Sequence, residues 1–346
     1  MSVFLNQILA LAEKSLIPDW LIRYGIRNLC RKRNAEISRK TNNLNDFIDK
    51  MKNGPIAPIP DVANEQHYEV PAAFFERVLG PNRKYSGCLW ENQTVDLGQA
   101  EAASLEQVCQ RAEIQNGHSI LELGCGWGSL TLWMAKHFPN STVVAVSNST
   151  AQKQLIEAKA VNAGLDNVEV ITADMNDFQT DRQFDRIVSI EMFEHMRNWK
   201  VLLNQISHWL KEQGKLFIHV FSNASFAYEF LSEGASNWMG RYFFSGGLMP
   251  SHDLIKSFND DLSVTHEWTI NGVHYARTAE AWLKNLDNDR QNIRALMVDN
   301  YGKDLAGIWL QRWRIFFMAC AELFQYDNGK QWQISHYLLE KRFANV

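Results

Sequence analysis

Five short apolar runs separated by helical patterns constrain the fold of this chain more than any other feature. The runs have the length of buried strands, and they lie at Ser119–Leu123, Thr142–Val146, Val168–Thr172, Asp185–Ile190 and Lys215–His219. The helical patterns lie at residues 101–112, 151–163 and 199–212. Because parallel strands need crossover connections, which helices usually provide, this alternation predicts an α/β fold with a doubly wound parallel sheet.

Two segments fall outside this alternation. Residues 1–60 combine helical patterns with Gly54–Pro60, where three prolines in six positions predict an extended connector. Residues 61–346 form the second predicted unit, with an insertion at about 220–310 that is rich in Trp, Phe and Tyr. Gln331–Leu338 has the pattern of a late strand that returns to the sheet edge. We therefore expect a helical arm, a connector, and one large domain with an aromatic-rich helical insertion.

Composition argues against several classes of protein. The 35 Lys and Arg against 39 Asp and Glu give a net charge of −4, which weakens a nucleic-acid role. No apolar run approaches the roughly 18 residues of a membrane-spanning helix. The five cysteines form no CxxC pair, so they favour neither a disulfide framework nor a structural zinc, and a reducing compartment suits them best. We expect a cytoplasmic protein with no metal, nucleic-acid partner or transmembrane segment.

The arm carries a basic cluster, defined here as Arg27, Arg31, Lys32 and Arg33. A solvated helix face is the simpler interpretation of such a cluster. Docking onto an anionic lipid surface is the alternative. The sequence does not separate these interpretations, and it leaves the oligomeric state open, with a homodimer as one expectation.

A glycine-rich loop, Glu-Leu-Gly-Cys-Gly-Trp-Gly, ends the first apolar run. Gly124, Gly126 and Gly128 allow a sharp turn and a close approach of ligand to backbone. A dinucleotide-binding fingerprint would need glycine where this chain has Ser129. With Glu122 before it, the loop resembles motif I of the S-adenosylmethionine-dependent methyltransferases. The resemblance implies S-adenosylmethionine as cofactor and S-adenosylhomocysteine as product, with Glu122 helping to hold the methionine part.

Two further segments complete the predicted cofactor site. The second strand is followed by a polar run that includes Asn148 and Gln152, with no acid for the ribose hydroxyls. This run is similar to that of the cyclopropane fatty acid synthase and coclaurine N-methyltransferase group. After the third strand, Asp174 stands beside Met175, where a carboxylate would accept the adenine amino group. A turn or N-cap role is the alternative for Asp174.

Segments along nearly the whole chain resemble the coclaurine N-methyltransferase family, which is related to the cyclopropane fatty acid synthases. The similar stretches are Glu13–Asp19, His67–Val70, Tyr85–Trp90, Ile190–Trp199, Tyr242–Gly247, Asn271–Tyr275 and Ala321–Gly329. The resemblance implies a class I methyltransferase with a Rossmann-like sheet. It also implies that Tyr68, Tyr85 and Ser86 close over the cofactor, with ordinary packing of the arm as the alternative.

The segment from Glu191 to His195 follows the fourth strand, at the carboxyl edge where open α/β sheets bind ligands. If the segment is helical, these two side chains share one face. An amine with a pKa of about 10 is mostly protonated, so a carboxylate and an imidazole could take its proton and free the lone pair. In coclaurine-type enzymes the matching residues are the catalytic pair, and we include Glu194 in the catalytic set. A capping carboxylate and a packed histidine are the alternative.

The aromatic insertion is suited to an acceptor pocket, because ring faces attract cations and can enclose a flat amine. The predicted substrate-binding residues are His219, Tyr242, Phe243, Tyr275 and Phe324. His219 is included because cyclopropane synthases, which resemble this chain at Glu194 and His219, bind a bicarbonate there. Most of the other rings are expected to be core.

Three functions are weighed. The favoured one is N-methylation of a small aromatic or alkaloid-like amine by Glu191 and His195. The second is methylene transfer to unsaturated phospholipid acyl chains, supported by the basic cluster and by Glu194. Against it, Gly87 follows the Tyr-Ser pair where the synthases have Cys, and they have Gly in place of Glu191. The third is a cofactor-binding scaffold without catalysis, which the intact catalytic pair disfavours.

Overall fold

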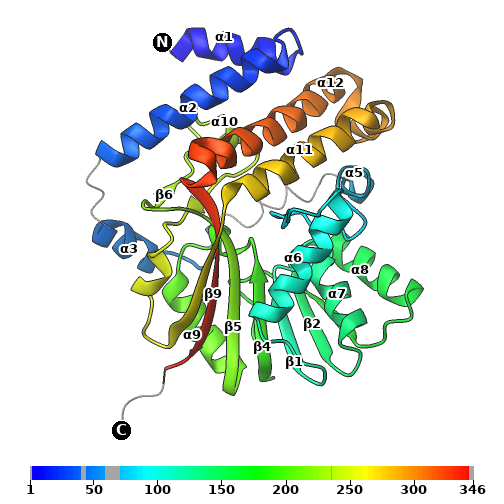
Figure 1. The fold of residues 1–346 in the computed structure, drawn as a ribbon, viewed down its shortest axis with the longest axis vertical. Helices are drawn as coiled ribbons and strands as arrows, with labels where there is room; N and C mark the ends of the chain where they lie inside the picture. The colour runs from blue at the N-terminus through cyan, green and yellow to red at the C-terminus, as the bar shows by residue number, and fades with distance from the viewer. Residues whose placement is uncertain (1, 40–43, 59–70, 235, 343–346) are drawn as a thin grey trace.

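The computed structural model describes residues 2–39, 44–58, 71–234 and 236–342, and its centre is a seven-stranded sheet (Figure 1). The strand order is β3-β2-β1-β4-β5-β9-β8. Five neighbouring strands are parallel: β1 (Ser119–Leu123), β2 (Thr142–Ser147), β3 (Val168–Thr172), β4 (Phe184–Ile190) and β5 (Leu210–Asn223). Each predicted apolar run is a strand, and the doubly wound sheet is confirmed.

Two antiparallel strands extend the sheet beyond β5. β9 (Trp332–Lys341) pairs with β5, and β8 (Leu262–Ile270) pairs with the other side of β9. The late strand is therefore present, but it lies inside the sheet and the edge is β8. The prediction of a wholly helical insertion is also wrong, because β8 belongs to that insertion and its backbone groups pair with the open side of β9.

Helices cover both faces of the sheet. α6 (Leu97–Arg111), α7 (Ser129–His137) and α8 (Thr150–Asn162) pack on one face, and α3 (Leu44–Lys52) and α9 (Trp199–Trp209) pack on the other. Neighbouring residues of β1 show the division, since Ile120 packs with α6 and α7, whereas Leu121 packs with α9. A strand that is buried on both faces needs such a continuous apolar run.

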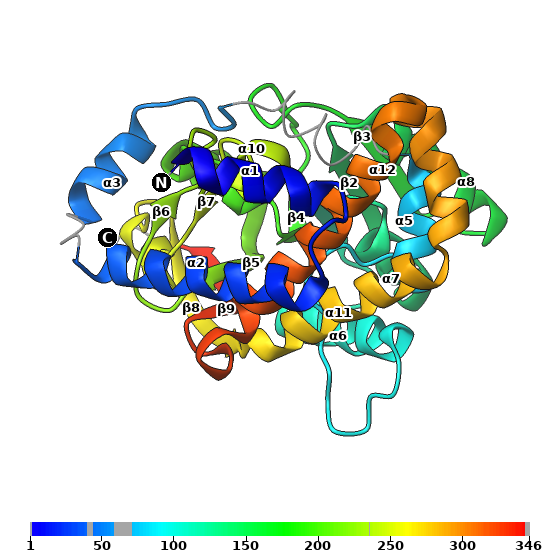
Figure 2. The ribbon, with the colours of Figure 1, turned by 90° about the horizontal axis from the view of Figure 1, so that it is seen from above.

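A helical layer lies across one end of the sheet. It consists of α11 (Gly272–Asn288) and α12 (Arg290–Gln325), and the arm helices α1 (Ser2–Glu13) and α2 (Asp19–Arg39) lie on its outer side (Figure 1, Figure 2). The shorter elements are α5 (Ala72–Val78), β6 (Tyr228–Glu229), α10 (Trp238–Tyr242), β7 (Leu248–Met249), and the 3₁₀ turns η1 (Phe193–His195), η2 (Leu254–Ser257) and η3 (Tyr326–Gly329).

Charged side chains fasten the arm to this layer. The guanidinium of Arg314 on α12 donates hydrogen bonds to both carboxylate oxygens of Asp19, at 2.6 and 3.0 Å, and of Asp287, at 2.6 and 3.0 Å. The hydrogen bonds from Arg314 hold the pKa of Asp19 below its usual value. Arg23 on α2 pairs in the same way with Glu280 and Glu322. The arm is thus part of the folded body.

The tryptophans of the second half are mostly core. Trp282, Trp313 and Trp332 are at most 1% exposed, and they pack under the helical layer with the rings of Phe74 and Phe317. None of the helices in the described ranges is long and apolar enough to cross a membrane. The aromatic content therefore builds a large interior in the first place.

Candidate active site

The glycine-rich loop turns sharply between β1 and α7. Gly124, Gly126 and Gly128 have φ angles of +77°, +52° and +79°, in the left-handed region that favours glycine. A Cβ atom at Gly128 would lie 2.6 Å from a side-chain carbon of Ile156. A Cβ at Gly126 would meet no atom of the described residues within 4 Å. Gly128 is therefore needed for packing, whereas Gly126 faces open space.

That open space belongs to a cavity at the carboxyl ends of the parallel strands, with about 780 Å³ of empty volume including the part that is open to solvent. Eight predicted residues line it: Gly124, Gly126, Asn148, Gln152, Asp174, Met175, Glu191 and His195. The sequence analysis did not assign a role to the other lining residues, which are Ala57, Val146, Ser147, Ala173, Met192, Met196, Ser245 and Gly246.

Polar groups on the cofactor side of the cavity are held in place by their neighbours. The Ser147 hydroxyl donates to Oε1 of Gln152 at 2.6 Å, and Nε2 of this buried amide has no hydrogen-bond partner among the described atoms. A buried donor without a partner favours a ligand that accepts a hydrogen bond. Asp174 uses Oδ1 to accept the Asn176 amide at 2.7 Å, so it stabilises its turn and also lines the cavity.

Glu122 lies behind the loop. It is 2% exposed, does not line the cavity, and accepts a hydrogen bond from the Thr131 hydroxyl at 2.5 Å. Burial raises its pKa to about 8, and the Thr131 hydrogen bond opposes that rise. Its predicted contact with the cofactor stays a prediction, while its visible role is to join β1 to α7.

Glu191 is the first residue after β4, and its backbone is not helical. Its φ is +47°, and its amide donates to the His219 carbonyl at 2.8 Å. The 3₁₀ turn begins only at Phe193. The condition under which Glu191 and His195 would share one helix face, a helical segment from Glu191, is therefore not met. The tight turn nevertheless directs both side chains to the cavity.

Three donors among the described residues hold the Glu191 carboxylate. Oε1 is 2.9 Å from the Gly87 amide and 3.2 Å from Nε2 of His219, and Oε2 accepts the Tyr275 hydroxyl at 2.9 Å. Because each carboxylate oxygen has about two acceptor positions, Oε2 keeps one for a ligand. Burial raises the pKa of Glu191 to about 7, and the nearby Lys84 ammonium and the hydrogen bonds oppose that rise.

Glu194 occupies a different environment. It is 1% exposed, does not line the cavity, and has one carboxyl oxygen without a partner among the described atoms. Burial and the charge of Glu191 raise its pKa well above the usual value. Two buried carboxyl groups this close do not both ionise readily, so the proton resides on Glu194 and the charge on Glu191. A direct catalytic role of Glu194 stays a prediction.

A loop before α6 supplies Gly87, and two residues that the sequence analysis missed hold this loop. The Glu101 carboxylate accepts the amides of Gly80, Asn82 and Lys84 at 2.9, 2.7 and 3.2 Å. The buried Lys84 ammonium donates to Ser86 Oγ and to the Gly87 carbonyl, both at 2.6 Å. A Cβ at Gly87 would lie 2.8 Å from the Tyr275 ring. No sequence motif marked Lys84 or Glu101.

The remaining predicted residues lie outside the cavity lining. Ser86 is buried against Lys84, Tyr85 packs on Phe75 and Trp282, and Tyr68 lies outside the described residues. Phe243 stacks on Phe316 with ring centroids 4.4 Å apart, Phe324 stacks on Tyr275 at 4.1 Å, and Arg312 lies 4.0 Å above the Tyr242 ring. Neither these rings nor His219 line the cavity, so contact with an acceptor stays a prediction for all of them.

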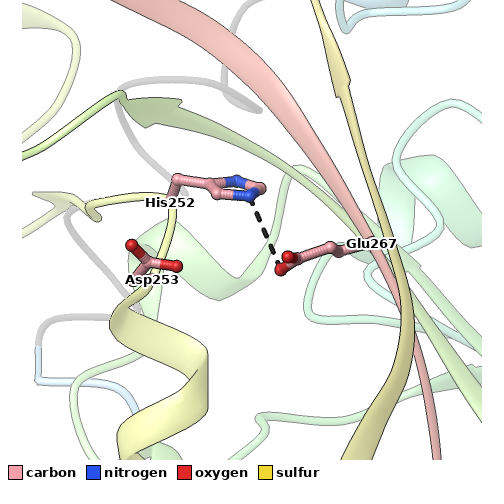
Figure 3. Close-up of side chains that lie close together, drawn as sticks. All are labelled: His252, Asp253 and Glu267. Carbon is pink, nitrogen blue, oxygen red and sulfur yellow. Dashed lines mark ion pairs between the residues drawn. The ribbon is translucent and has the colours of Figure 1, made fainter.

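One surface cluster outside this site combines possible metal ligands. His252, Asp253 and Glu267 place their ligand atoms within 4.8 Å of one another (Figure 3). The Lys256 ammonium lies 2.8 Å from a carboxylate oxygen of both Asp253 and Glu267. A lysine already neutralises the two acids, and an exposed acidic cluster of this kind needs no metal.

A parallel sheet with this strand order, a glycine loop after β1 and a cavity at the carboxyl ends define a class I, S-adenosylmethionine-dependent methyltransferase. The profile of the mycolic acid cyclopropane synthetase family matches residues 59–334. The (S)-coclaurine N-methyltransferase of Thalictrum flavum subsp. glaucum is 37% identical, over 97% of this chain and 96% of the relative. The chain belongs to the coclaurine N-methyltransferase family, and its cofactor is S-adenosylmethionine.

Two further comparisons place the chain within the family. A crystal structure of a coclaurine N-methyltransferase bound to N-methylheliamine and S-adenosylhomocysteine is 35% identical with a TM-score of 0.93, covering 97% of this chain and 99% of that one. The cyclopropane-fatty-acyl-phospholipid synthase of Escherichia coli K12 is 28% identical, over 79% of this chain and 67% of the relative. The chain is thus an N-methyltransferase, and the lipid synthases are more distant.

Proposed function

We propose that this enzyme methylates the nitrogen of a small aromatic or alkaloid-like amine and that Glu191 accepts the amine proton. The observation that carries the proposal is the Glu191 carboxylate, held on the cavity by three donors with one acceptor position left on Oε2. Its pKa of about 7 suits a group that must exchange a proton near neutral pH. The relatives named for alkaloid substrates support the same acceptor class.

The residues around the glycine loop fit the cofactor. Gly126 leaves open space that the methionine part would occupy, the Gln152 amide has a donor without a partner among the described atoms, and Asp174 lines the cavity with a carboxylate that would accept from the adenine amino group. Asn148 and Met175 line the same side of the cavity. When bound, S-adenosylmethionine supplies an electrophilic methyl group on a sulfonium.

The chain's own residues prepare the acceptor. An ammonium N–H bond breaks, the proton forms an O–H bond at Oε2 of Glu191, and the electron pair stays on the nitrogen as the lone pair that reacts. The carboxylate attracts the cation before this step. His195 lies on the same cavity with its ring stacked on Phe244, the centroids 4.5 Å apart, so its imidazole has a fixed orientation beside the acceptor.

The alternative is methylene transfer to an unsaturated lipid, which the wider family makes the natural competitor. Two residues, Gly87 and Glu191, favour the amine as acceptor. They are in contact, because the Gly87 amide donates a hydrogen bond to the Glu191 carboxylate. The resemblance implies a different residue at both positions in the synthases, namely Cys and Gly. Gly87 and Glu191 therefore belong to one site, in which the Glu191 carboxylate accepts the proton.

Methyl-labelled cofactor distinguishes the two functions. The enzyme is incubated with primary and secondary aromatic amines in one arm and with vesicles of unsaturated phospholipid in the other. Label is expected in the amine fraction, with product formed only when an amine is present. Label confined to the lipid would establish the alternative, and cofactor binding without transfer to any acceptor would indicate a scaffold.

We further propose a cytoplasmic homodimer. Within the described chain the five cysteines are buried and unpaired, as suits a reducing compartment, and the arm exposes Leu16 (67%), Trp20 (68%) and Tyr24 (52%). Much of the basic cluster is engaged inside the chain, with Arg27 bound to Glu322, which favours a docked arm over a lipid surface. Light scattering of the enzyme and of Trp20→Ser tests the dimer, and sedimentation with anionic vesicles tests the lipid contact.

A further inference from the structure

A line of four hydrogen-bonded side chains runs through the sheet to the Glu191 carboxylate. Arg111, the last residue of α6, places Nη1 2.8 Å from Nδ1 of His336 on β9. Nε2 of His336 lies 2.8 Å from Nδ1 of His219 on β5, and Nε2 of His219 lies 3.2 Å from Oε1 of Glu191. The two histidines are direct cross-strand partners and are at most 1% exposed.

Arg111, at the start of this line, determines the direction of every hydrogen bond in it. A guanidinium only donates, so Nδ1 of His336 must accept. A neutral imidazole with a bare Nδ1 carries its proton on Nε2, which then donates to Nδ1 of His219. By the same reasoning His219 carries its proton on Nε2 and donates to Glu191. Burial, together with the nearby Arg111 and Lys84, lowers the pKa of both imidazoles far below the usual value, so both are neutral.

We propose that Arg111 and His336 are positioning residues that lock His219 as a hydrogen-bond donor to Glu191, and so keep Glu191 ionised and ready to accept the amine proton. With the opposite tautomers, the lone pair of His219 Nε2 would face the carboxylate and favour protonated Glu191. The inference rests on the proposed role of Glu191, but the tautomers themselves do not depend on it.

The same geometry excludes the line as an exit for the proton. A proton leaving through it would have to end on Arg111, which is already protonated and cannot accept. The proton that Glu191 accepts must therefore return to solvent through the cavity. His219 is accordingly neither a substrate ligand nor a base, which agrees with both of its ring nitrogens being occupied by protein partners.

Other charged and titratable groups also act on this line and remain the same in the variants below. Those around Glu191 are Lys84, Glu194, Tyr275, Cys88 and Cys320. Around the histidines they are Lys84 and Arg111. Arg111 also lies 5.0 Å from the centre of the Trp268 ring. A matched control exists in Arg277, which lies 4.7 Å from the centre of the Trp90 ring.

The test compares Arg111→Met, Arg111→Lys and Arg277→Met. Arg111→Met removes the donor and keeps the apolar stem, whereas lysine is again a donor only. In Arg111→Met we expect the acidic limb of kcat/KM to move up by about one pH unit, a loss of about tenfold near pH 6 that recovers at high pH. Arg111→Lys and Arg277→Met should keep the parent profile. A uniform loss at every pH would show a merely structural role and overturn the proposal.

A second measurement needs no activity. In ¹⁵N-histidine NMR of the parent enzyme, bare and protonated ring nitrogens resonate far apart, and His219→Gln and His336→Gln identify the two signals among the ten histidines. We expect both residues to be protonated at Nε2 and bare at Nδ1. A proton on Nδ1 of His219 would overturn the proposal even if Glu191 is the base. The expected tautomers with an unchanged rate in Glu191→Gln would overturn the proposed function instead.

Discussion

The two sides of the cavity are built in different ways. On the cofactor side, each group follows a strand directly along the chain: Gly124 and Gly126 after β1, Asn148 after β2, and Asp174 after β3. On the acceptor side, the Glu191 carboxylate is held by Gly87, His219 and Tyr275, which are 104, 28 and 84 residues away in sequence. A contiguous motif therefore forms one side, and long-range packing forms the other.

The largest expected effect of breaking the acceptor side comes from Glu191→Gln. The amide keeps the size of the side chain but cannot take a proton, so kcat should fall by about 10²- to 10⁴-fold. Binding of S-adenosylhomocysteine, measured by calorimetry, should be unchanged because the cofactor side is separate. Glu212→Gln, on an exposed part of β5, is the matched control. A loss of cofactor binding in Glu191→Gln would show that the two sides are not independent.

Both sides bury a carboxyl group with a raised pKa, Glu122 at about 8 and Glu191 at about 7, so stability should depend on pH. The folded state keeps a proton that the unfolded chain releases near pH 4.5, and the free energy of unfolding therefore falls as pH rises through 7 and 8. From these two carboxyl groups we expect a loss of about 3 to 4 kcal/mol between pH 6 and 8 in urea unfolding without cofactor. Part of this loss is offset by His219 and His336, which are neutral in the folded state and release a proton near pH 6.5 in the unfolded chain.

Single substitutions show which side of the cavity causes this pH dependence of the free energy of unfolding. Glu122→Gln should remove the part that extends to pH 8, and Glu191→Gln the part that ends near pH 7. If neither substitution changed the difference in the free energy of unfolding between pH 6 and pH 8, the raised pKa values of these two carboxyl groups would be contradicted.

A smaller effect is expected on the cofactor side from Gly126→Ala. Its positive φ and its place on the cavity predict both backbone strain, of roughly 1 kcal/mol, and steric interference with the cofactor. The Kd for S-adenosylhomocysteine should rise about tenfold, or 1.4 kcal/mol. Gly164→Ala has a similar φ of +66° and equally open surroundings, away from the cavity, so it should lose stability without losing affinity. Equal affinities in the two variants would remove Gly126 from the cofactor site.

The smallest effect is expected in the arm, which is attached to the acceptor side. Asp19→Asn removes a partner of Arg314, but the Asp19 side chain is 43% exposed, so the loss of stability should be at most about 1 kcal/mol. Urea unfolding at low and high salt measures it, and the difference from the parent should shrink as salt screens the pair. The exposed Asp181→Asn is the control on the cofactor side. A loss that is independent of salt would mean that packing, not charge, fastens the arm.

The features that the sequence predicts lie mostly on the cofactor side, which local sequence builds, and the features that it misses depend on long-range packing. Strands β1 to β5 and the residues that follow them were predicted because apolar runs and glycine turns act within a few neighbouring residues. β8 was missed because its partner β9 lies about 70 residues later, and a partly exposed strand has no continuous apolar run. The sequence leaves the turn at Glu191 open, with a helix as one condition, because four-residue spacing cannot reveal a positive φ.

The sequence by itself determined the five parallel strands, the cofactor loop and the identity of the acceptor-side carboxylate, since each depends on residues close together in the chain. Only the tertiary structure decided what surrounds that carboxylate. It placed Lys84 and Gly87 beside Glu191, left one carboxyl oxygen of the buried Glu194 without a partner among the described atoms, and lined up Arg111, His336 and His219 behind Glu191. Burial and hydrogen bonds set a pKa, and both arise from residues that meet only when the chain has folded.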